Sequence, residues 1–233
     1  MSSQDSSLKV SEIFQSIQGE GPSAGCPCSF LRLATCNLRC SWCDTPYSWD
    51  FTRYDYAREV TTLSIETLAA QIRAAGQTRL VITGGEPLIQ QTKLALLCEL
   101  LPPSLCIEIE TNGTLVPSED LCARIDQWNV SPKLENSGEP LERRLQLPAL
   151  ERLKDTGRAW LKLVVAGSED ASEAAELARL LAWPKAQILL MPLAANAAEL
   201  RKTGPLVATA AEKLGFRFSP RLHLELFGGQ RGH

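Results

Sequence analysis

Three cysteines lie within eight positions of the stretch LRLATCNLRCSWCDTPYS, at Cys36, Cys40 and Cys43. Thiolates bind soft metals, so this spacing indicates either a zinc site or an iron–sulfur cluster. A closed tetrahedral zinc site needs a fourth ligand, and no second C-x2-C pair follows at the usual distance. The two histidines, His223 and His233, have no partner at metal-binding spacing. A cubane cluster held by three thiolates instead leaves one iron free to bind a substrate.

Five further cysteines could supply a ligand in principle, namely Cys26, Cys28, Cys98, Cys106 and Cys122. Cys98 falls on a predicted amphipathic helix and Cys106 on a predicted strand, which favours small, buried hydrophobic side chains at both positions. Cys26 and Cys28 lie just upstream of a C-x3-C-x2-C motif that is already complete. We therefore interpret both as non-ligands.

The composition is that of an ordinary globular protein, with 44% hydrophobic and 22% charged residues among 233. The net charge of −3 gives no support to nucleic-acid binding. The polar start, MSSQDSSLKV, lacks the apolar core of a signal peptide, and no run approaches the roughly 18 to 20 apolar residues that span a membrane. We expect one domain, residues 1–233, in the reducing cytoplasm, where clustered cysteines are typical of metal binding or catalysis.

Predicted strands alternate with predicted helices along the chain. Ser64 is predicted to cap one helix and Gly76 to end it, whereas Gly204–Pro205 predicts a kink or break in the last long helix. Residues 135–148 are predicted to be an irregular insertion. About six β/α repeats favour an α/β fold with a parallel sheet, closed or partly closed as a barrel. The predicted strands are residues 28–35, 78–87, 105–114, 128–133, 158–167 and 186–193, and the predicted helices are residues 64–76, 88–101, 168–183 and 197–215.

Polar motifs follow the ends of four predicted strands, at residues 83–87, 110–113, 131–133 and 191–193. In β/α barrels the carboxyl ends of the strands carry the active site. Since one accidental motif would mean little and a series is hard to produce by chance, we expect the active site at this edge.

The cysteine motif, CNLRCSWC, resembles the signature of the radical S-adenosylmethionine (SAM) superfamily. A longer stretch, IFQSIQGEGPSAGCPCSFLRLATCNLRCSWCDTPYS, is similar to the 7-carboxy-7-deazaguanine synthases of queuosine and 7-deazapurine biosynthesis. The similarity resumes at TGGEP, ETNGT, SPK and RLHLELFG, so it covers most of the chain. It implies a partial (β/α)6-type barrel of the radical SAM type, with fewer or irregular helices.

The resemblance also implies a reaction. A [4Fe–4S] cluster would bind the amine and carboxylate of SAM at its free iron and cleave SAM to a 5′-deoxyadenosyl radical. That radical would take a hydrogen from C6 of 6-carboxy-5,6,7,8-tetrahydropterin, after which the ring contracts and ammonia leaves, as in a carbon–nitrogen lyase. The implied protein partners are a flavodoxin or ferredoxin as electron donor and a second copy of the chain in a homodimer.

Site residues are carried over from the family motifs one by one. The cluster ligands would be Cys36, Cys40 and Cys43, and the Thr45 hydroxyl would bind Mg²⁺, a hard ion that takes oxygen ligands. The Arg32 guanidinium would pair with the substrate carboxylate. SAM would contact Gly84, Gly85, Glu86, Glu110, Asn112, Ser131 and Lys133. The pterin would contact Gln18, Glu20, Arg32, Thr83 and His223.

The C-terminal segment, about residues 216–233, would complete the substrate site. Here the sequence departs from the family pattern, because GGQRGH extends past the LFG motif. Any role of a terminal carboxylate near the substrate therefore stays open.

Some of these residues also have a structural interpretation. Arg32 and Glu20 could form a surface ion pair, Thr45 could cap the turn before Pro46, and His223 could be a hydrogen-bonded residue at a strand end.

Two other functions are compatible with the cysteines. A glycyl-radical activase would share the cluster loop but would leave SIQGEG and RLHLELFG unexplained. A zinc-stabilised binding module would be colourless and would hold one zinc ion.

Overall fold

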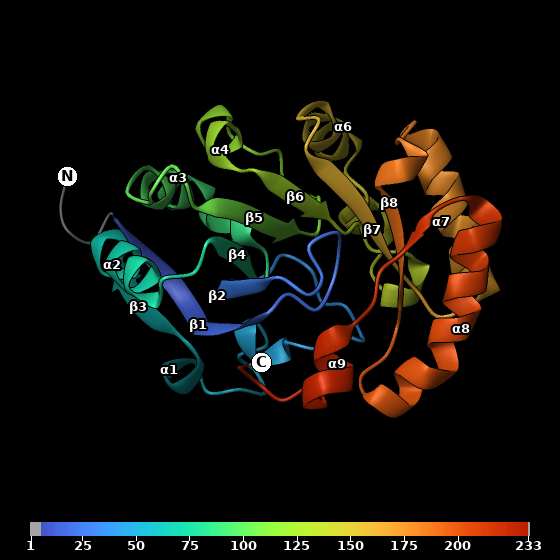
Figure 1. Ribbon diagram of the computed structural model, residues 1–233, viewed down its shortest axis with the longest axis horizontal. Coiled ribbons are helices and arrows are strands. Elements are labelled where there is room, and N and C mark those ends of the chain that lie inside the picture. The colour runs from blue at the N-terminus through green and yellow to red at the C-terminus, as the bar shows by residue number, and fades with distance from the viewer. Residues whose placement is uncertain (1–5, 233) are drawn as a thin grey trace.

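The computed structural model describes residues 6–232, which form one curved sheet with helices along its outer side (Figure 1). The strand order is β3-β1-β2-β4-β5-β6-β7-β8-β9, so β3 and β9 are the two edges of the described sheet. The strands are β1 (Ser7–Ile17), β2 (Pro27–Leu33), β3 (Thr61–Ser64), β4 (Arg79–Gly84), β5 (Cys106–Thr111), β6 (Gln127–Val130), β7 (Ala159–Val165), β8 (Ile188–Pro192) and β9 (Arg217–Phe218). The helices are α1 (Tyr56–Glu59), α2 (Ile65–Ala75), α3 (Gln91–Glu99), α4 (Glu119–Arg124), α5 (Leu141–Arg144), α6 (Leu147–Asp155), α7 (Ser168–Leu180), α8 (Ala197–Leu214) and α9 (Leu222–Phe227).

The predicted parallel sheet is confirmed. Strands β2, β4, β5, β6, β7 and β8 pair in parallel, each with the next, and at least one helix separates each from its successor. The six repeats predicted a closed or partly closed parallel sheet, and the family resemblance implied a partial (β/α)6 barrel; the open sheet agrees with both, with several short or irregular helices among the crossovers. The carboxyl ends of these strands meet at one edge, where the polar motifs lie.

An antiparallel addition at one edge was not predicted. Strand β1 pairs antiparallel with both β2 and β3 and so extends the parallel sheet by two strands. The register shifts at an irregularity between Val10 and Glu12. Such a bulge interrupts the period-two alternation that identifies a strand from sequence, which explains why β1 escaped prediction.

The ends of α2 were predicted correctly. The Ser64 side chain accepts a hydrogen bond from the Thr67 amide, and Gly76 adopts the left-handed conformation with φ 69°. Both devices satisfy backbone groups that a helix end leaves free. Between them, one apolar face packs into the core through Ile65, Leu68, Ala69 and Ile72.

Two predictions differ from the structure. Of the kink or break predicted at Gly204–Pro205, the break is wrong: helix α8 runs on through Pro205, because Val207 and Ala211 are buried in the main core and hold it against the sheet. Residues 135–148 are less irregular than predicted, since they contain α5 and the start of α6. Buried Ala149, Leu150 and Leu153 fix α6 beside β6 and β7.

The C-terminal segment joins the two sides of the sheet. The Leu222 amide donates to the Gly19 carbonyl at 2.9 Å, which ties α9 to the loop after β1. Figure 1 shows α9 between α8 and the β1 side of the molecule. His223 lies on this helix and not at the end of a strand.

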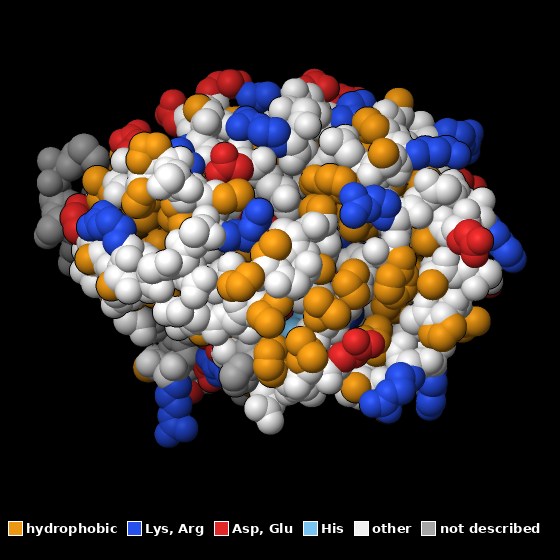
Figure 2. Space-filling model, viewed as in Figure 1, with side chains coloured by type: hydrophobic (Ala, Val, Ile, Leu, Met, Phe, Trp, Pro, Cys, Tyr) orange, Lys and Arg blue, Asp and Glu red, His pale blue; other side chains and the backbone are white. Residues whose placement is uncertain are grey.

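The face of the molecule drawn in Figure 2 carries mixed charge. On the face drawn in Figure 2, acidic and basic side chains are interspersed, as the net charge of −3 leads one to expect. Within residues 6–232, none of the helices has the length and apolar character needed to cross a membrane.

Candidate active site

A cavity of about 700 Å³ opens at the carboxyl ends of the parallel strands. The predicted motifs from separate parts of the sequence all reach it. Among the predicted site residues, Glu86 alone is absent from the cavity wall. The others all line it: Gln18, Glu20, Arg32, Cys36, Cys40, Cys43, Thr45, Thr83, Gly84, Gly85, Glu110, Asn112, Ser131, Lys133 and His223.

The thiol side of the cavity is the loop of Cys36, Cys40 and Cys43 with the turn 83–87. Thr35, just before the first cysteine, has φ 78°, which is an unusual and strained conformation for a β-branched residue. Two hydrogen bonds hold it there. Its amide donates to the Ser48 carbonyl at 2.7 Å, and its carbonyl accepts from the Glu86 amide at 2.8 Å. The strained residue therefore connects the cysteine loop to the glycine turn.

The three thiols suit a soft metal group. All eight cysteines are free, and burial raises the pKa of Cys36 to about 12 and moves that of Cys40 in the same direction. A bound metal would displace these protons, because thiolates and not thiols are the ligands. In residues 6–232 no three Cys, His, Asp or Glu side chains converge on one metal ion. A cubane does not require this, because each thiolate binds a different iron. The loop therefore fits an iron–sulfur cluster.

Indole and guanidinium groups surround the thiols. The Trp49 indole nitrogen donates to the Cys43 sulfur at 3.2 Å, and the Arg39 guanidinium stacks 4.7 Å from the Trp49 ring centroid. The Thr45 hydroxyl lies 3.8 Å from the same sulfur. Thr45 also begins the short 3-10 helix Pro46–Ser48, but its side chain makes no capping hydrogen bond.

The two glycines of the turn are required by close backbone packing. A Cβ on Gly84 would overlap the backbone of Leu33, and one on Gly85 would overlap the Thr35 carbonyl. The amides of Gly85 and Glu86 donate to the Leu33 and Thr35 carbonyls at 3.0 and 2.8 Å. Because these N–H groups are used, the carbonyl oxygens of the turn are the groups that could accept from a ligand amine.

Glu86 lies behind the wall and organises it. Its carboxylate accepts from the Leu88 amide at 2.9 Å, the Thr111 hydroxyl at 2.8 Å and the Asn112 amide at 2.7 Å. Burial raises the pKa of Glu86, and these three donors oppose the effect. The side chain fastens the turn after β4 to the turn after β5. Asn112 then reaches the cysteine loop, where its side-chain nitrogen donates to Asn37 at 3.0 Å.

Ser131 and Lys133 follow β6 on the thiol side. The Lys133 amine lies 3.4 Å from the Ser131 hydroxyl and 5.3 Å from the Trp42 ring centroid. The Ser131 amide donates to the Thr111 carbonyl at 2.8 Å, which fixes this turn beside the previous one. A hydroxyl and a cation are thus presented together to the cavity.

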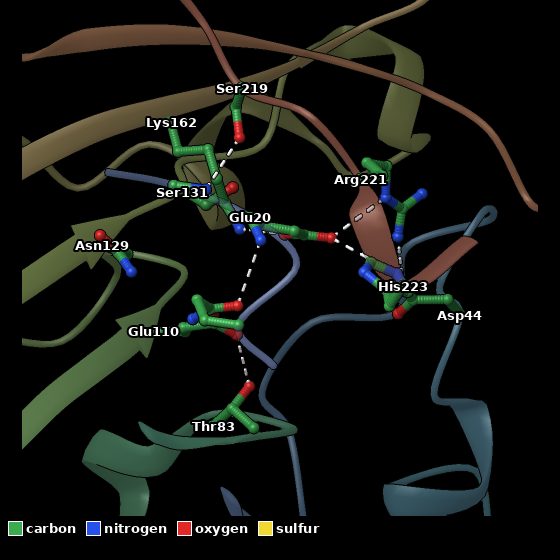
Figure 3. Close-up of polar contacts among 12 residues, drawn as sticks. Glu20, Asp44, Thr83, Glu110, Asn129, Ser131, Lys162, Ser219, Arg221 and His223 are labelled. Atoms are coloured by element: carbon green, nitrogen blue, oxygen red, sulfur yellow. Dashed lines mark hydrogen bonds and ion pairs between the residues drawn. The ribbon is translucent and has the colours of Figure 1, made fainter. Parts of the chain in front are cut away.

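The charged side of the cavity is centred on Glu20 and consists of Glu20, Lys162, Arg221 and His223 (Figure 3). The Glu20 carboxylate pairs with the Lys162 amine and, at 3.0 Å, with the Arg221 guanidinium. His223 approaches the same carboxylate at 3.8 Å. Arg221 also pairs at 2.7 Å with Asp44, which follows the last cysteine of the loop. The network therefore joins β7, the C-terminal segment and the cysteine loop.

The pKa shifts follow from this arrangement. Burial alone would raise the pKa of Glu20, but the charges of Lys162 and Arg221 hold it well below its ordinary value. The Glu20 charge in turn raises the pKa of Lys162 against the opposing effect of burial. Burial lowers the pKa of His223, and Glu20 only partly opposes this. Glu20 and Lys162 are therefore ionised at neutral pH, and His223 is held toward its neutral form.

A second carboxylate lies between the two sides. Glu110 accepts from the Thr83 hydroxyl at 2.8 Å and from the Gln18 side-chain nitrogen at 3.2 Å (Figure 3 shows the first contact). Gln18 also donates to Glu108 at 2.8 Å, deeper in the sheet. Gln18 and Thr83 are thus held by acceptors on β5. Glu110 brings predicted SAM and substrate residues into direct contact.

Arg32 lies next to another acid on β1. Its Nε donates to Glu12 at 2.8 Å, and the Tyr47 hydroxyl donates to the same carboxylate at 2.9 Å. The pairing of Arg32 with Glu20 that we considered from sequence is wrong, because each has a different partner. The Arg32 guanidinium is largely buried and faces the cavity.

Sequence reasoning assigned no role to Glu12, Asp44, Lys162 or Arg221. A signal for Lys162 was available, since it is a lone lysine in the apolar run WLKLVV, and a buried lysine needs a partner. Arg221 lies inside the quoted motif RLHLELFG, next to the histidine that was chosen. Glu12 gave no signal, because β1 was not predicted.

Known proteins resemble this chain along most of its length. The family model for the radical SAM superfamily matches residues 32–181. The 7-carboxy-7-deazaguanine synthase of Pyrobaculum aerophilum is 36% identical over 97% of both chains. That of Hyperthermus butylicus is 37% identical, over 93% of this chain and 92% of the relative.

Solved structures agree with these relatives. The crystal structure of QueE from Escherichia coli has a TM-score of 0.68 and 28% identity, and the match covers 93% of this chain and 95% of that one. The structure of Streptococcus suis SuiB bound to SAM, at 14% identity and a TM-score of 0.55, shares the fold. Radical SAM membership implies a [4Fe–4S] cluster and SAM, which fits the three free thiols at the cavity. The chain belongs to the 7-carboxy-7-deazaguanine synthase family of the radical SAM superfamily.

Proposed function

We propose that this protein converts 6-carboxy-5,6,7,8-tetrahydropterin to 7-carboxy-7-deazaguanine with loss of ammonia. The observation that carries the proposal is that one cavity contains both a three-thiol loop and a buried charged network. Family membership supplies the substrate class. A glycyl-radical activase or a zinc module would leave the charged side of the cavity without a role.

The thiol side holds the cofactors in this proposal. Cys36, Cys40 and Cys43 are the cluster ligands. When bound, the cluster and SAM supply the 5′-deoxyadenosyl radical that takes a hydrogen atom from C6 of the substrate. Carbonyl oxygens of the turn at Gly84 and Gly85 accept from the SAM amine, since the neighbouring amides are already used. Glu86 fixes the turn from behind. Further SAM contacts come from Glu110, Asn112, Ser131 and Lys133.

The charged side holds the substrate. Arg32 binds the pterin carboxylate through its guanidinium fork. Gln18, Glu20 and Thr83 supply hydrogen-bonding groups to the polar ring, and the largely neutral His223 can accept or donate at its edge. Lys162 and Arg221 keep Glu20 ionised and correctly placed. The Thr45 hydroxyl is the proposed protein ligand to Mg²⁺, with the substrate carboxylate as a second oxygen donor.

The protein partners are also proposals. Arg39 and Arg143 are exposed beside the cysteine loop, and Arg143 donates to the Asn37 carbonyl at 2.6 Å. Cations at this place suit an acidic electron donor of the flavodoxin or ferredoxin type. We also propose a homodimer, because the open sheet has edges to cover. A reducing cytoplasmic location fits eight free cysteines.

The decisive experiment is an enzyme turnover assay under anaerobic conditions. The reconstituted, reduced protein is mixed with SAM, Mg²⁺ and carboxytetrahydropterin, and the products are identified by mass spectrometry. We expect 5′-deoxyadenosine and the deazaguanine together. A tetrahydropterin without the 6-carboxylate serves as the matched control and should give no deazaguanine. Formation of 5′-deoxyadenosine alone from the carboxylated substrate would refute the substrate assignment while leaving the superfamily assignment intact.

A further inference from the structure

The chain continues beyond α9 and turns back over the cavity. Gly228, Gly229 and Gly232 have φ of 64°, 76° and 83°, the left-handed region that glycine adopts readily. These turns bring residues 229–232 into the cavity wall. This is the GGQRGH extension that departs from the family pattern, and it carries one cation, Arg231.

Arg231 reaches across the cavity mouth to the opposite side of the sheet. Its Nε donates to Glu12 on β1, and a terminal nitrogen lies 2.7 Å from Glu59 at the end of α1. Its guanidinium also lies over the Tyr47 ring, 3.9 Å from the centroid. A single side chain of the tail thus contacts three residues from three separate segments. Such a set of contacts is specific and directional.

These contacts converge on the acid that holds Arg32. One Glu12 oxygen accepts from Arg32 and Tyr47, and the other accepts from Arg231. Of the three guanidinium nitrogens of Arg32, only Nε donates a hydrogen bond to Glu12. Within residues 6–232, the terminal amino groups of Arg32 make no hydrogen bond, so this end of the fork is free for a carboxylate.

A charge count shows what Arg231 contributes. Two carboxylates, Glu12 and Glu59, meet two cations, Arg32 and Arg231, so the four charges balance. Without Arg231, a substrate carboxylate at Arg32 would be the third negative charge around a single cation. Like charges in a partly desolvated site repel strongly. Arg231 supplies the second cation. Burial would raise the pKa of Glu12, but Arg231 and Arg32 together lower it, so the acid stays ionised and fully paired.

We propose that Arg231 is a positioning residue for the substrate: by neutralising Glu12 it allows Arg32 to accept the substrate carboxylate, while residues 228–232 close over the bound ring. The inference depends on the proposed function, because the carboxylate in question is that of the pterin. It concerns this chain's own extension. Arg231 acts through Glu12 and need not touch the substrate.

The test compares Arg231→Ala, Arg231→Lys and the control Arg58→Ala in the reconstituted enzyme. Arg58 is 85% exposed on α1 next to Glu59, so its loss removes the same charge from the same region without a contact to Glu12. We expect Arg231→Ala to raise the KM for the carboxylated pterin about threefold to tenfold, with kcat little changed. Arg231→Lys should recover much of the affinity, because the charge is kept.

A second comparison isolates the mechanism. In a Glu12→Gln background the acid is no longer charged, so adding Arg231→Ala should change KM much less than it does in the wild type. An equal change in both backgrounds, or an unchanged KM in Arg231→Ala, would overturn the proposal. The wild type in the same assay tests the proposed function: failure to convert the carboxypterin overturns both, whereas normal conversion with an insensitive Arg231 overturns only this inference.

Discussion

On the thiol side of the cavity the chain is held mainly backbone to backbone, whereas on the charged side it is held by buried ion pairs. Gly85 approaches Thr35 so closely that no side chain fits, and the strained Thr35 accepts the Glu86 amide. Across the cavity, Glu20 is fixed by Lys162 and Arg221. The first arrangement depends on shape and the second on charge.

The difference suits the ligands of the proposed function. A cubane cluster and the amine of SAM need cysteine sulfurs and carbonyl dipoles at fixed positions, which a packed loop provides. A carboxylated pterin carries charge and hydrogen-bonding edges, and ionised groups recognise these well. It follows that the thiol side should lose its structure when a side chain is added where the backbone packs closely. The charged side should be destabilised when a charged side chain is replaced by a neutral one.

The largest expected effect is on the thiol side. Replacing Cys36, Cys40 and Cys43 together by alanine should abolish cluster binding, because in the proposed function each thiolate would hold a separate iron. Anaerobic reconstitution followed by iron and sulfide analysis gives the measurement, and the variant should stay colourless. Cys26→Ala is the matched control, since this cysteine is close in sequence and lies outside the cavity wall. Retention of full iron content by the triple variant would falsify the ligand assignment.

A steric change should act next most strongly. A methyl group at Gly85 would overlap the Thr35 carbonyl and touch the Cys36 Cβ, and because the overlapped carbonyl is backbone it cannot rotate away as a flexible side chain could. We expect Gly85→Ala to lower the free energy of unfolding by about 3 kcal/mol and to reduce cluster loading. Denaturant unfolding under reducing conditions provides the first value. Gly167→Ala is the control, because its added Cβ meets no atom within 4 Å. Equal midpoints for the two variants would contradict the packing argument.

The thiol side could be predicted from sequence because its parts are contiguous. Cys36, Cys40 and Cys43 lie close together in one loop, and the glycine turn directly follows an apolar run that is typical of a buried strand. What sequence could not reveal is why those glycines are needed. They were expected to contact SAM, and the structure shows in addition that their missing side chains make room for Leu33 and Thr35.

The charged side could be predicted only in part, because its partners are far apart in sequence. Glu20 and Lys162 are 142 residues apart and meet only when β7 is placed in the sheet. Neither the period of the hydrophobic residues nor the secondary-structure propensity of the segments predicts such a pairing. The same holds for Glu12 and Arg231, which are separated by 219 residues. The parallel core was predictable because each β/α repeat is local, whereas β1 and its bulge were not.

Removing a charge should destabilise the charged side of the cavity, here through an unpaired buried carboxylate and not through a steric overlap. Lys162→Met leaves Glu20 buried with Arg221 as its remaining close cation. Breaking a buried ion pair typically costs about 3 kcal/mol or more. We expect a loss of that order in urea unfolding, with an unchanged iron content. Exposed Lys202 on α8 gives the control variant Lys202→Met.

A double variant sharpens the same comparison. Glu20→Gln with Lys162→Met removes both charges, so its cost should be smaller than the sum of the two single costs. Strict additivity would mean that the pair is not coupled and that the charged side is held by packing, as the thiol side is.

The smallest expected effect is a dependence on pH that belongs to His223. Burial lowers the pKa of His223 in the folded chain below its unfolded value of about 6.5. The unfolded chain therefore binds the proton more readily, and stability falls as the pH drops below about 6.5 and through the folded pKa. Glu20 acts in a separate window, because its lowered pKa makes its contribution disappear only at more acidic pH.

The matched variant is His223→Gln, which keeps a polar side chain but cannot titrate. Its unfolding free energy, measured from pH 7.5 to 5.5, should depend on pH less steeply than that of the wild type. The difference between the two curves isolates this one residue, since His233, the other histidine in the chain, is present in both proteins. The Gly85→Ala variant should retain the full wild-type slope, because its damage is steric. If Gly85→Ala instead flattened the slope as His223→Gln does, the separation between a side built on shape and a side built on charge would not hold.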